Sequence, residues 1–446
     1  MSALTAAQLA GVAQLIEMVP DAVLARLAEA VSLMHSDRAE ALARMIALEG
    51  RDRERRAIAF GPVIPLFDAR ADGFPTEVYP RRTLARLWKL ASVPEPGLTE
   101  RLDMIGTEDA VIHRISDQFL RAAARALRET PEACWPDGEE ARRERLARLL
   151  ELAPLMRRAA ERLDQWIQKP DEDQVAELRV LFAQAAEQFP DGPERLVELM
   201  FAHMPEAPPV LRILTLSAEA AAHSDVLSNS ELGPFVDTLL AATETRVAAV
   251  EAFVAAPARD QVRATVAAIG WCADVLREMR LTVKPEPASA WGMAVHDMQL
   301  RIERQAIAAL ETGSAHVEAV FPLVRPKLAP KTASASPDLA APAEAPEIEA
   351  AMNLLGAIDQ ARVTLSEFGC EGVRLATMKA VISHLVEFTE KGVLKPTEAG
   401  PNGPKLLRRA ADVLRAIGEK ELARAVLRRL DARLNDAGMA SSGAIA

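Results

Sequence analysis

The most suggestive polar side chains in this sequence are Asp109, His113 and Asp117, which follow one another at intervals of four residues. Residues four apart on a helix lie on the same face, and two carboxylates with an imidazole on one face could ligate a divalent metal ion. The column continues with Arg121 and Arg125, so a helical ion pair between Asp117 and Arg121 is the simpler alternative. The three residues are the only candidate metal ligands, and we expect no cofactor.

The sequence carries no local signature of catalysis. It lacks His-Glu-x-x-His, Gly-x-Ser-x-Gly, Gly-x-Gly-x-x-Gly and the phosphate loop that ends in Gly-Lys-Ser/Thr. Its three cysteines are far apart and form no Cys-x-x-Cys, which argues against a disulfide framework and a thiolate zinc site and favours a reducing cytoplasm. An enzyme or ligand-binding protein with a pocket inside its helices stays an alternative, because distant residues can assemble a site.

The first candidate partner-binding segment is the proline-rich stretch 60–82. It contains four prolines and four aromatic residues, among them Phe67, Phe74 and Tyr79. Four prolines exclude a continuous helix, so we expect a non-helical arm with room for a short strand at Val63–Phe67. The aromatic side chains either pack on the protein's own helices or form an interface, where aromatic residues are enriched.

The second candidate is the pair of amphipathic segments between Lys405 and Leu434, which carries nine basic and four acidic residues. Its proposed contact residues are arginines, namely Arg408, Arg409, Arg424, Arg428 and Arg429. Such a hairpin could dock on an acidic partner or an anionic membrane surface. It could equally dock on its own chain, because residues 171–325 carry 12 basic and 23 acidic groups.

The composition predicts that helices position all of these residues. Half of the 446 residues are hydrophobic, but only 4% are aromatic, and Ala, Leu, Arg and Glu are good helix formers. Residues recur at helical spacing in several stripes, for example Val236, Leu240, Thr243, Val247, Val250 and Val254, or Leu406, Ala410, Val413, Leu414 and Ile417. We therefore predict an all-α protein, a helical bundle or an irregular α-solenoid-like body.

One long segment has a heptad-like seam of apolar residues, at Leu146, Leu149, Ala153, Met156, Ala160, Leu163 and Ile167. Steps of three and four residues are typical of coiled-coil packing. Pro154 lies inside the seam and is expected to kink the helix, or divide it in two, near Leu150–Ala153.

The proline and alanine content predicts the domain organisation. A helical body is expected over 1–325, with a possible subdivision near 131–137 or 168–171. Residues 326–346 contain five prolines and few large apolar side chains, which predicts a flexible linker. A small helical module would follow over 347–436, and the small residues of 437–446 predict a disordered tail.

These observations favour a non-enzymatic cytoplasmic scaffold, adaptor or regulatory protein that binds protein partners through helical surfaces. The net charge of −11 argues against nucleic acid as a partner. The sequence contains no stretch of eighteen apolar residues, so we expect no transmembrane segment. The alternatives are the enzyme or ligand-binding protein named above and a peripheral membrane protein that uses the basic hairpin. Docking of the module on the body is a further possibility.

Overall fold

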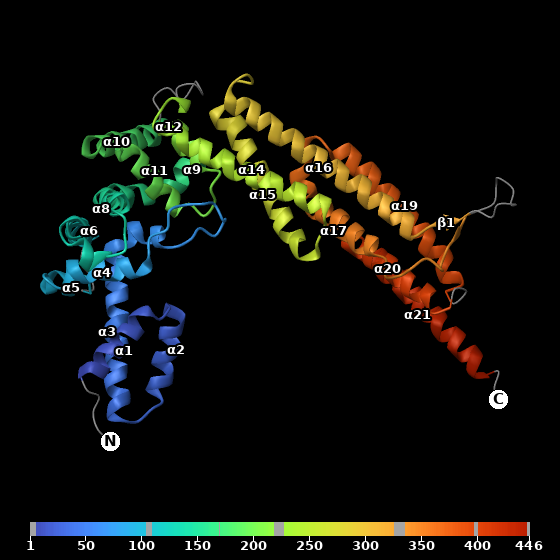
Figure 1. The fold of residues 1–446 in the computed structure, drawn as a ribbon, viewed down its shortest axis with the longest axis horizontal. Helices are drawn as coiled ribbons and strands as arrows, with labels where there is room; N and C mark the ends of the chain where they lie inside the picture. The colour runs from blue at the N-terminus through green and yellow to red at the C-terminus, as the bar shows by residue number, and fades with distance from the viewer. Residues whose placement is uncertain are drawn as a thin grey trace. The chain divides into compact units, whose positions relative to one another are not determined.

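The computed structural model describes residues 6–103, 109–168, 170–217, 227–324, 335–396 and 400–443. These residues are almost entirely helical (Figure 1), which confirms the predicted all-α class. Two short strands, β1 (Leu323–Val324) and β2 (Ser336–Pro337), pair antiparallel. Contacts divide the chain into two compact units, Met1–Pro234 and Phe235–Ala446.

The first unit begins with three helices that surround a small core of their own. Ten further helical segments follow in the described part of this unit. Its helices are α1 (Ala6–Met18), α2 (Asp21–Ser32), α3 (Asp37–Phe60), η1 (Gly61–Phe67, a 3-10 helix), α4 (Arg81–Ser92), α5 (Pro96–Arg101), α6 (Asp109–Glu129), α7 (Pro131–Cys134), α8 (Glu140–Ala160), α9 (Leu163–Gln168), α10 (Glu172–Gln188), α11 (Gly192–His203) and α12 (Val210–Ser217).

Helix α8 lies at the centre of the first unit and packs against α6, α10, α11 and η1. It is one helix through Pro154 and ends at Ala160, so a division of the helix near Leu150–Ala153 is wrong. A proline removes one backbone hydrogen bond, and burial of the leucines around it offsets that loss. Side chains on both sides of the predicted seam, such as Leu152 and Leu155, are also buried, so α8 is a core helix with several neighbours.

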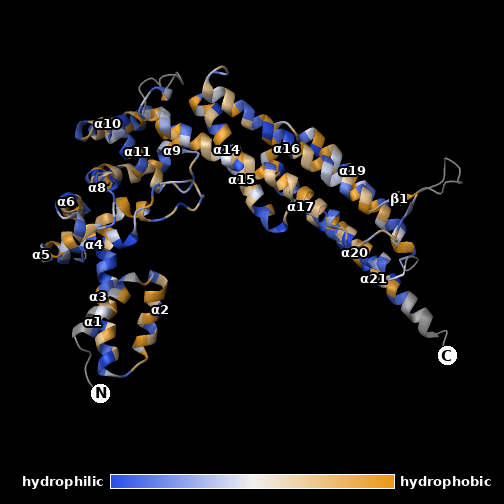
Figure 2. Cartoon of the chain, viewed as in Figure 1, coloured by the Kyte–Doolittle hydropathy of each residue, from blue (hydrophilic) through white to orange (hydrophobic). Residues whose placement is uncertain are grey.

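The second unit is built from long helices with one short strand pair. Its helical segments are α14 (Gly233–Ala255), η2 (Arg259–Gln261), α15 (Val262–Glu278), the π-helix η3 (Met279–Val283), α16 (Ala290–Val320), α17 (Pro346–Gln360), α18 (Arg362–Leu365), η4 (Ser366–Phe368), α19 (Glu371–Leu394), α20 (Asn402–Ala416) and α21 (Lys420–Gly443). Hydrophobic and hydrophilic residues alternate along most helices of both units (Figure 2), as expected of amphipathic helices that bury one side.

The two units do not correspond to the predicted body and module. The boundary near residue 234 falls inside the predicted body 1–325, and it coincides with neither of the subdivisions predicted near 131–137 and 168–171. Helix α17, at the start of the predicted module, packs along α16, and both α17 and α18 contact α15. The predicted module therefore shares a core with the last helices of the predicted body.

The predicted linker 326–346 is only partly within the described residues, since 326–334 lie outside them. Its second part, 335–346, packs on the second unit. Leu339 and Ala343 are buried, and the side-chain amide of Asn402 donates hydrogen bonds to the backbone oxygens of Leu339, at 3.0 Å, and Ala341, at 2.6 Å. Two buried apolar residues and these bonds hold a segment whose composition alone predicted flexibility.

The C-terminal helix also differs from its prediction. Helix α21 continues to Gly443, so most of the predicted disordered tail 437–446 has helical backbone. The preceding turn is as expected, because Gly418 has a φ of 86°. Glycine adopts this left-handed conformation at little cost, which is why it commonly ends a helix.

Candidate functional site

The polar column of α6 is used to join two helices. The guanidinium of Arg157, on α8, donates a hydrogen bond of 2.6 Å to Asp117 and one of 3.3 Å to the backbone oxygen of His113. The partner of Asp117 is therefore a residue of a neighbouring helix, whereas the sequence suggested Arg121. A carboxylate that neutralises a half-buried arginine is not free to ligate a cation.

No metal site is present at Asp109, His113 and Asp117. Across the described ranges, no group of three or more His, Cys, Asp or Glu side chains is arranged to hold a metal ion. Beside the column, the hydroxyl of Ser116 and one terminal nitrogen of Arg157 are buried without a hydrogen-bond partner among the described residues. Spacing along one helix could not show these contacts, since Arg157 lies 40 residues further along the chain.

The aromatic residues of the arm lie in the core of the first unit. Phe67, Phe74 and Tyr79 are all buried, Tyr79 with only 1% of its surface exposed. The ring of Tyr79 packs edge-on against Trp135 at 5.8 Å between centroids, and that of Phe74 against Phe201 at 5.0 Å. The alternative in which these side chains pack on the protein's own helices describes the structure, and none of the three presents an exposed surface to a partner.

The predicted strand at Val63–Phe67 is wrong, because these residues lie in the 3-10 helix η1. Pro62 has the fixed φ that suits the first turn of a helix, and Pro65 lies further inside the same 3-10 helix. The ring nitrogen Nε2 of His203, on α11, lies 2.9 Å from the backbone oxygen of Pro62. Burial lowers the pKa of His203, and the contact with the Pro62 oxygen opposes that shift.

A buried ion pair holds the middle of the arm. Arg70 and Asp72 form two hydrogen bonds, and their side chains are 6% and 8% exposed. Arg70 also donates to the backbone oxygen of Phe201 and lies over that ring, 4.0 Å from its centroid. Burial opposes ionisation of Asp72, but hydrogen bonds from Arg70 and from the backbone of Phe74 hold the pKa of Asp72 below its ordinary value.

The end of the arm is fastened by alternating charges. Glu77 contacts Arg145 of α8 at 3.1 Å, Arg145 contacts Glu198 of α11 at 2.9 Å, and Glu198 contacts Arg195 at 2.9 Å. The hydroxyl of Tyr79 is buried without a hydrogen-bond partner in the described chain. Burial raises the pKa of Tyr79, and the carboxylates of Glu198 and Glu77 raise it further, so the phenol stays neutral.

The proposed basic contact residues of α20 and α21 have different surroundings. Arg409 reaches Glu349 of α17 at 3.0 Å, and Arg429 reaches Glu390 of α19 at 3.6 Å. These two arginines therefore contact the second unit's own helices, and much of the hairpin's positive charge is neutralised locally.

The remaining arginines of the hairpin are more exposed. Arg408 lies 3.5 Å from Asp431 across the hairpin, and Arg424 pairs with Glu421 three residues before it. Arg428 is exposed and has no acidic partner among the described residues. Exposed pairs of this kind contribute about 0–1 kcal/mol each, so they could be exchanged for the acids of a partner.

A small cavity lies between α14, α15, α16 and α17 of the second unit. Its volume is about 10 Å³, and Thr265 and Gln305 are the only polar residues in its lining. One water molecule needs about 10–15 Å³, whereas ligand pockets enclose about 300–1,000 Å³. This cavity is therefore too small for a substrate or cofactor.

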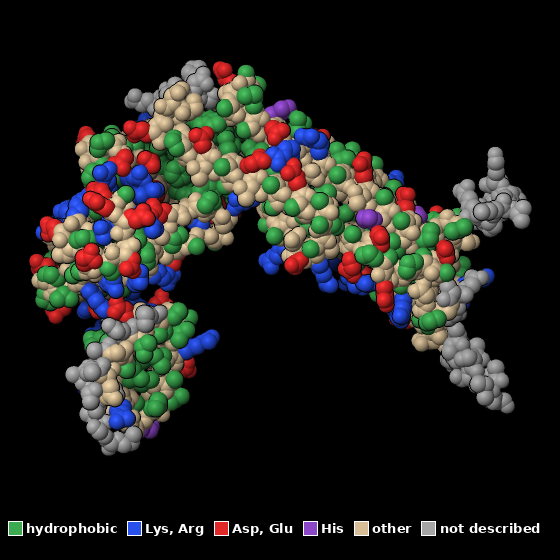
Figure 3. All heavy atoms as spheres, viewed as in Figure 1, with side chains coloured by type: hydrophobic (Ala, Val, Ile, Leu, Met, Phe, Trp, Pro, Cys, Tyr) green, Lys and Arg blue, Asp and Glu red, His purple; other side chains and the backbone are tan. Residues whose placement is uncertain are grey.

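The sequence did not lead us to expect that large apolar side chains on and between the first three helices are exposed. Five large apolar side chains there are between 49% and 77% exposed: Leu15, Val23, Leu33, Met34 and Leu48. Figure 3 shows hydrophobic side chains gathered over α2. The low charge of this segment could have indicated such exposed apolar side chains, because only four of the first 34 residues are charged.

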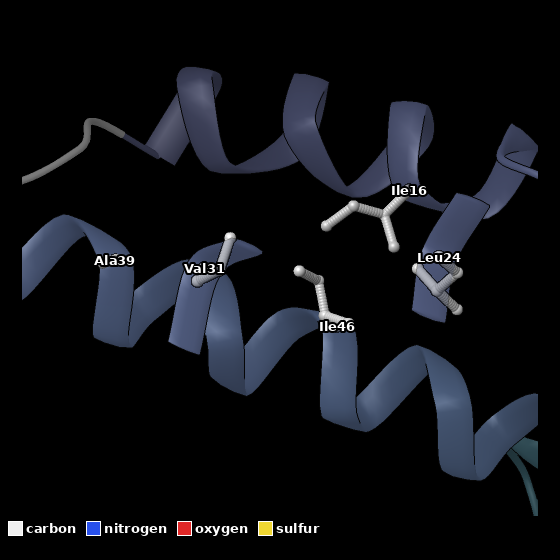
Figure 4. Close-up of a cluster of buried hydrophobic side chains, with 5 residues drawn as sticks. All are labelled: Ile16, Leu24, Val31, Ala39 and Ile46. Carbon is white, nitrogen blue, oxygen red and sulfur yellow. The ribbon is translucent and has the colours of Figure 1, made fainter. Parts of the chain in front are cut away.

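The same three helices have a modest core. Ile16, Leu24, Val31, Ala39 and Ile46 point toward one another between α1, α2 and α3 (Figure 4). Leu24 and Val31 are seven residues apart on α2 and face inward together. The opposite side of α2 therefore faces solvent, and it is the side that a partner can reach.

Comparison with models of protein families, with curated proteins and with solved structures finds no match for this chain. Along the described part of the chain, no helix is both long enough and apolar enough to cross a membrane.

Proposed function

We propose that this protein is a non-enzymatic scaffold or adaptor that acts through helical protein–protein interaction surfaces. The observation that carries the proposal is the gathering of hydrophobic side chains over α2 (Figure 3), in a segment where Leu33 and Met34, just after α2, are 77% and 60% exposed. Single exposed apolar residues are ordinary on a protein surface, whereas a gathered patch marks an interaction site.

Two acids next to this surface are already paired within the first unit. Glu17 contacts Lys89 at 2.5 Å, and Asp21 contacts Arg53 at 2.6 Å. These two acids are not available to a basic partner. The surface therefore favours a partner that is itself an apolar helix or helical face.

The alternatives have less support. Asp117 of the polar column is paired with Arg157, and the cavity between α14, α15, α16 and α17 is too small for a ligand. A peripheral membrane protein would use the basic hairpin, but Arg409 and Arg429 contact acids of the second unit. The proposal includes a cytoplasmic location, where the three buried cysteines stay reduced, and protein partners rather than nucleic acid.

Crosslinking of the full chain in its native host tests the proposal. The double variant Leu33→Glu, Met34→Glu places two charges on the apolar surface of α1–α3, and both side chains are exposed, so the fold is retained. We expect proteins that are crosslinked to the wild-type chain to be lost from the double variant, because burial of an unpaired carboxylate costs several kcal/mol.

The matched control is Val363→Glu, since Val363 is 77% exposed, as Leu33 is, but lies in the second unit. This variant should keep the wild-type partners. Identical partner sets for the wild type and the Leu33→Glu, Met34→Glu variant would overturn the assignment of the binding surface to α1–α3.

A further inference from the structure

The outward side of α2 has a regular pattern of residue types. Ala22, Arg26 and Glu29 of the helix and Leu33, its C-cap residue, follow one another at steps of four, three and four residues, and all four are exposed. Such steps place side chains along one seam of a helix. Leu24 and Val31 are buried on the opposite side, so this seam is the solvent-facing one.

The two charged residues of the seam lack partners in the described chain. Arg26 and Glu29 are exposed, and neither side chain forms an ion pair or hydrogen bond with another described residue, although the backbone oxygen of Glu29 accepts a bond of 2.7 Å from the Ser32 hydroxyl. The other acids of this region, Glu17 and Asp21, are paired with Lys89 and Arg53. The seam thus offers one free cation and one free anion between two apolar ends.

The seam is complementary to the same seam on a second α2 helix that runs in the opposite direction. If two α2 helices pack antiparallel about a two-fold axis between residues 27 and 28, Arg26 of each lies opposite Glu29 of the other. The same register places Ala22 opposite Leu33, a small residue against a large one. A two-fold interface repeats every contact, so it contains two ion pairs and two Ala–Leu contacts.

We propose that the solvent-facing seam of α2 packs against a second copy of this chain, antiparallel, through Ala22, Arg26, Glu29 and Leu33. The proposal rests on the proposed function, because it names a partner for the exposed side of α2. The ion pairs fix direction and register, and the apolar residues exclude water. A 12-residue helix is about 18 Å long, and stable interfaces bury about 800 Å² per partner, so we expect a dimer that dissociates on dilution.

Sedimentation equilibrium of the purified full chain over a range of concentrations tests this. The wild type should show a monomer–dimer equilibrium. Arg26→Glu puts like charges opposite one another twice and should weaken the dimer roughly tenfold or more. The exchange Arg26→Glu with Glu29→Arg restores opposite charges and should restore the dimer. The matched control is Arg121→Glu, an exposed arginine of α6, which should leave the equilibrium unchanged.

Each outcome decides the question. A wild type that stays monomeric overturns the proposal, and so does a dimer that tolerates Arg26→Glu or is not restored by the exchange. A monomeric wild type whose crosslinked partners in the host are lost on Leu33→Glu, Met34→Glu would refute the second copy and leave the scaffold function standing. A dimer with no other partner that depends on α2 would limit the function to self-association.

Discussion

At the scale of single residues, the arm depends on one buried ion pair. Arg70 and Asp72 neutralise each other at exposures of 6% and 8%, and Arg70 also binds the backbone oxygen of Phe201. Removal of one member of a buried pair leaves the other charge without compensation. The pair therefore fastens the segment between η1 and α4 to α11, in addition to the packing of its aromatic residues.

We predict that Asp72→Ala lowers the free energy of unfolding by about 3–5 kcal/mol. The matched control is Asp68→Ala in the same arm, because Asp68 pairs with Arg81 at exposures of 42% and 70%, and exposed pairs contribute about 0–1 kcal/mol. Chemical denaturation of the full chain at neutral pH, monitored by tryptophan fluorescence, measures the free energy of unfolding of both variants. Equal losses would show that burial of the pair does not matter.

The same carboxylate predicts a pH dependence. The pKa of folded Asp72 is below its ordinary value, and that of an unfolded Asp is about 3.9. The stability it contributes is therefore fully present above about pH 4 and is lost as the pH falls through the folded pKa. The difference between wild type and Asp72→Ala should shrink in denaturation curves measured below pH 4, and a constant difference would contradict this assignment.

Residue types were easier to predict than their partners. The spacing of Asp109, His113 and Asp117 correctly placed them on one helix, α6, but Arg157 lies 40 residues beyond Asp117. The prolines of the arm predicted a break, while Arg70 binds an oxygen 131 residues away. Local sequence shows what a side chain can do, and only the fold shows which distant group it meets.

At the scale of helices, apolar periodicity predicted the buried faces well. Val236, Leu240, Thr243, Val247 and Val250 are buried, although Val254 at the end of the same stripe is only half-buried, and all five residues of the stripe from Leu406 to Ile417 are buried. Each stripe is a property of one helix, so a single sequence contains it. The continuity of α8 through Pro154 was not predicted, because it depends on the helices that bury its leucines.

A glycine permits the close packing of α16 on α17. A Cβ atom at Gly313 would lie 2.7 Å from Cγ of Leu355. We predict that Gly313→Ala lowers the free energy of unfolding by about 1–3 kcal/mol through overpacking. The control is Gly270→Ala in α15, where nothing lies within 4 Å of the added atom.

The control should raise stability by up to about 1 kcal/mol, because alanine favours helices. Thermal unfolding of the full chain compares the two variants. Shifts of the same sign and size would show that Leu355 does not restrict position 313.

At the scale of the whole molecule, the division into units follows packing and not composition. The proline-rich segment 326–346 predicted a boundary, but α16 and α17 on either side of it pack together. Proline and alanine content is a local property. Whether the flanking helices share a core depends on Leu354 and Leu355, both fully buried, and their partners on α16 are distant in sequence.

We predict that residues 235–446 fold alone, whereas residues 347–446 do not. The shorter fragment loses α15 and α16 and exposes the side chains of α17 that pack on them. We expect a cooperative thermal transition for 235–446, and binding of an apolar dye without such a transition for 347–446. Cooperative unfolding of 347–446 would instead support the predicted C-terminal module.

The strand pair β1–β2 has a practical consequence for protein engineering. Leu323 lies opposite Pro337 and Val324 opposite Ser336, so the chain leaves and re-enters the second unit at neighbouring points. Because the cost of closing a loop grows slowly with its length, a reporter domain with adjacent termini can be inserted between these points. The inserted domain would be internal in the sequence, while α16 and α17 would keep their contact.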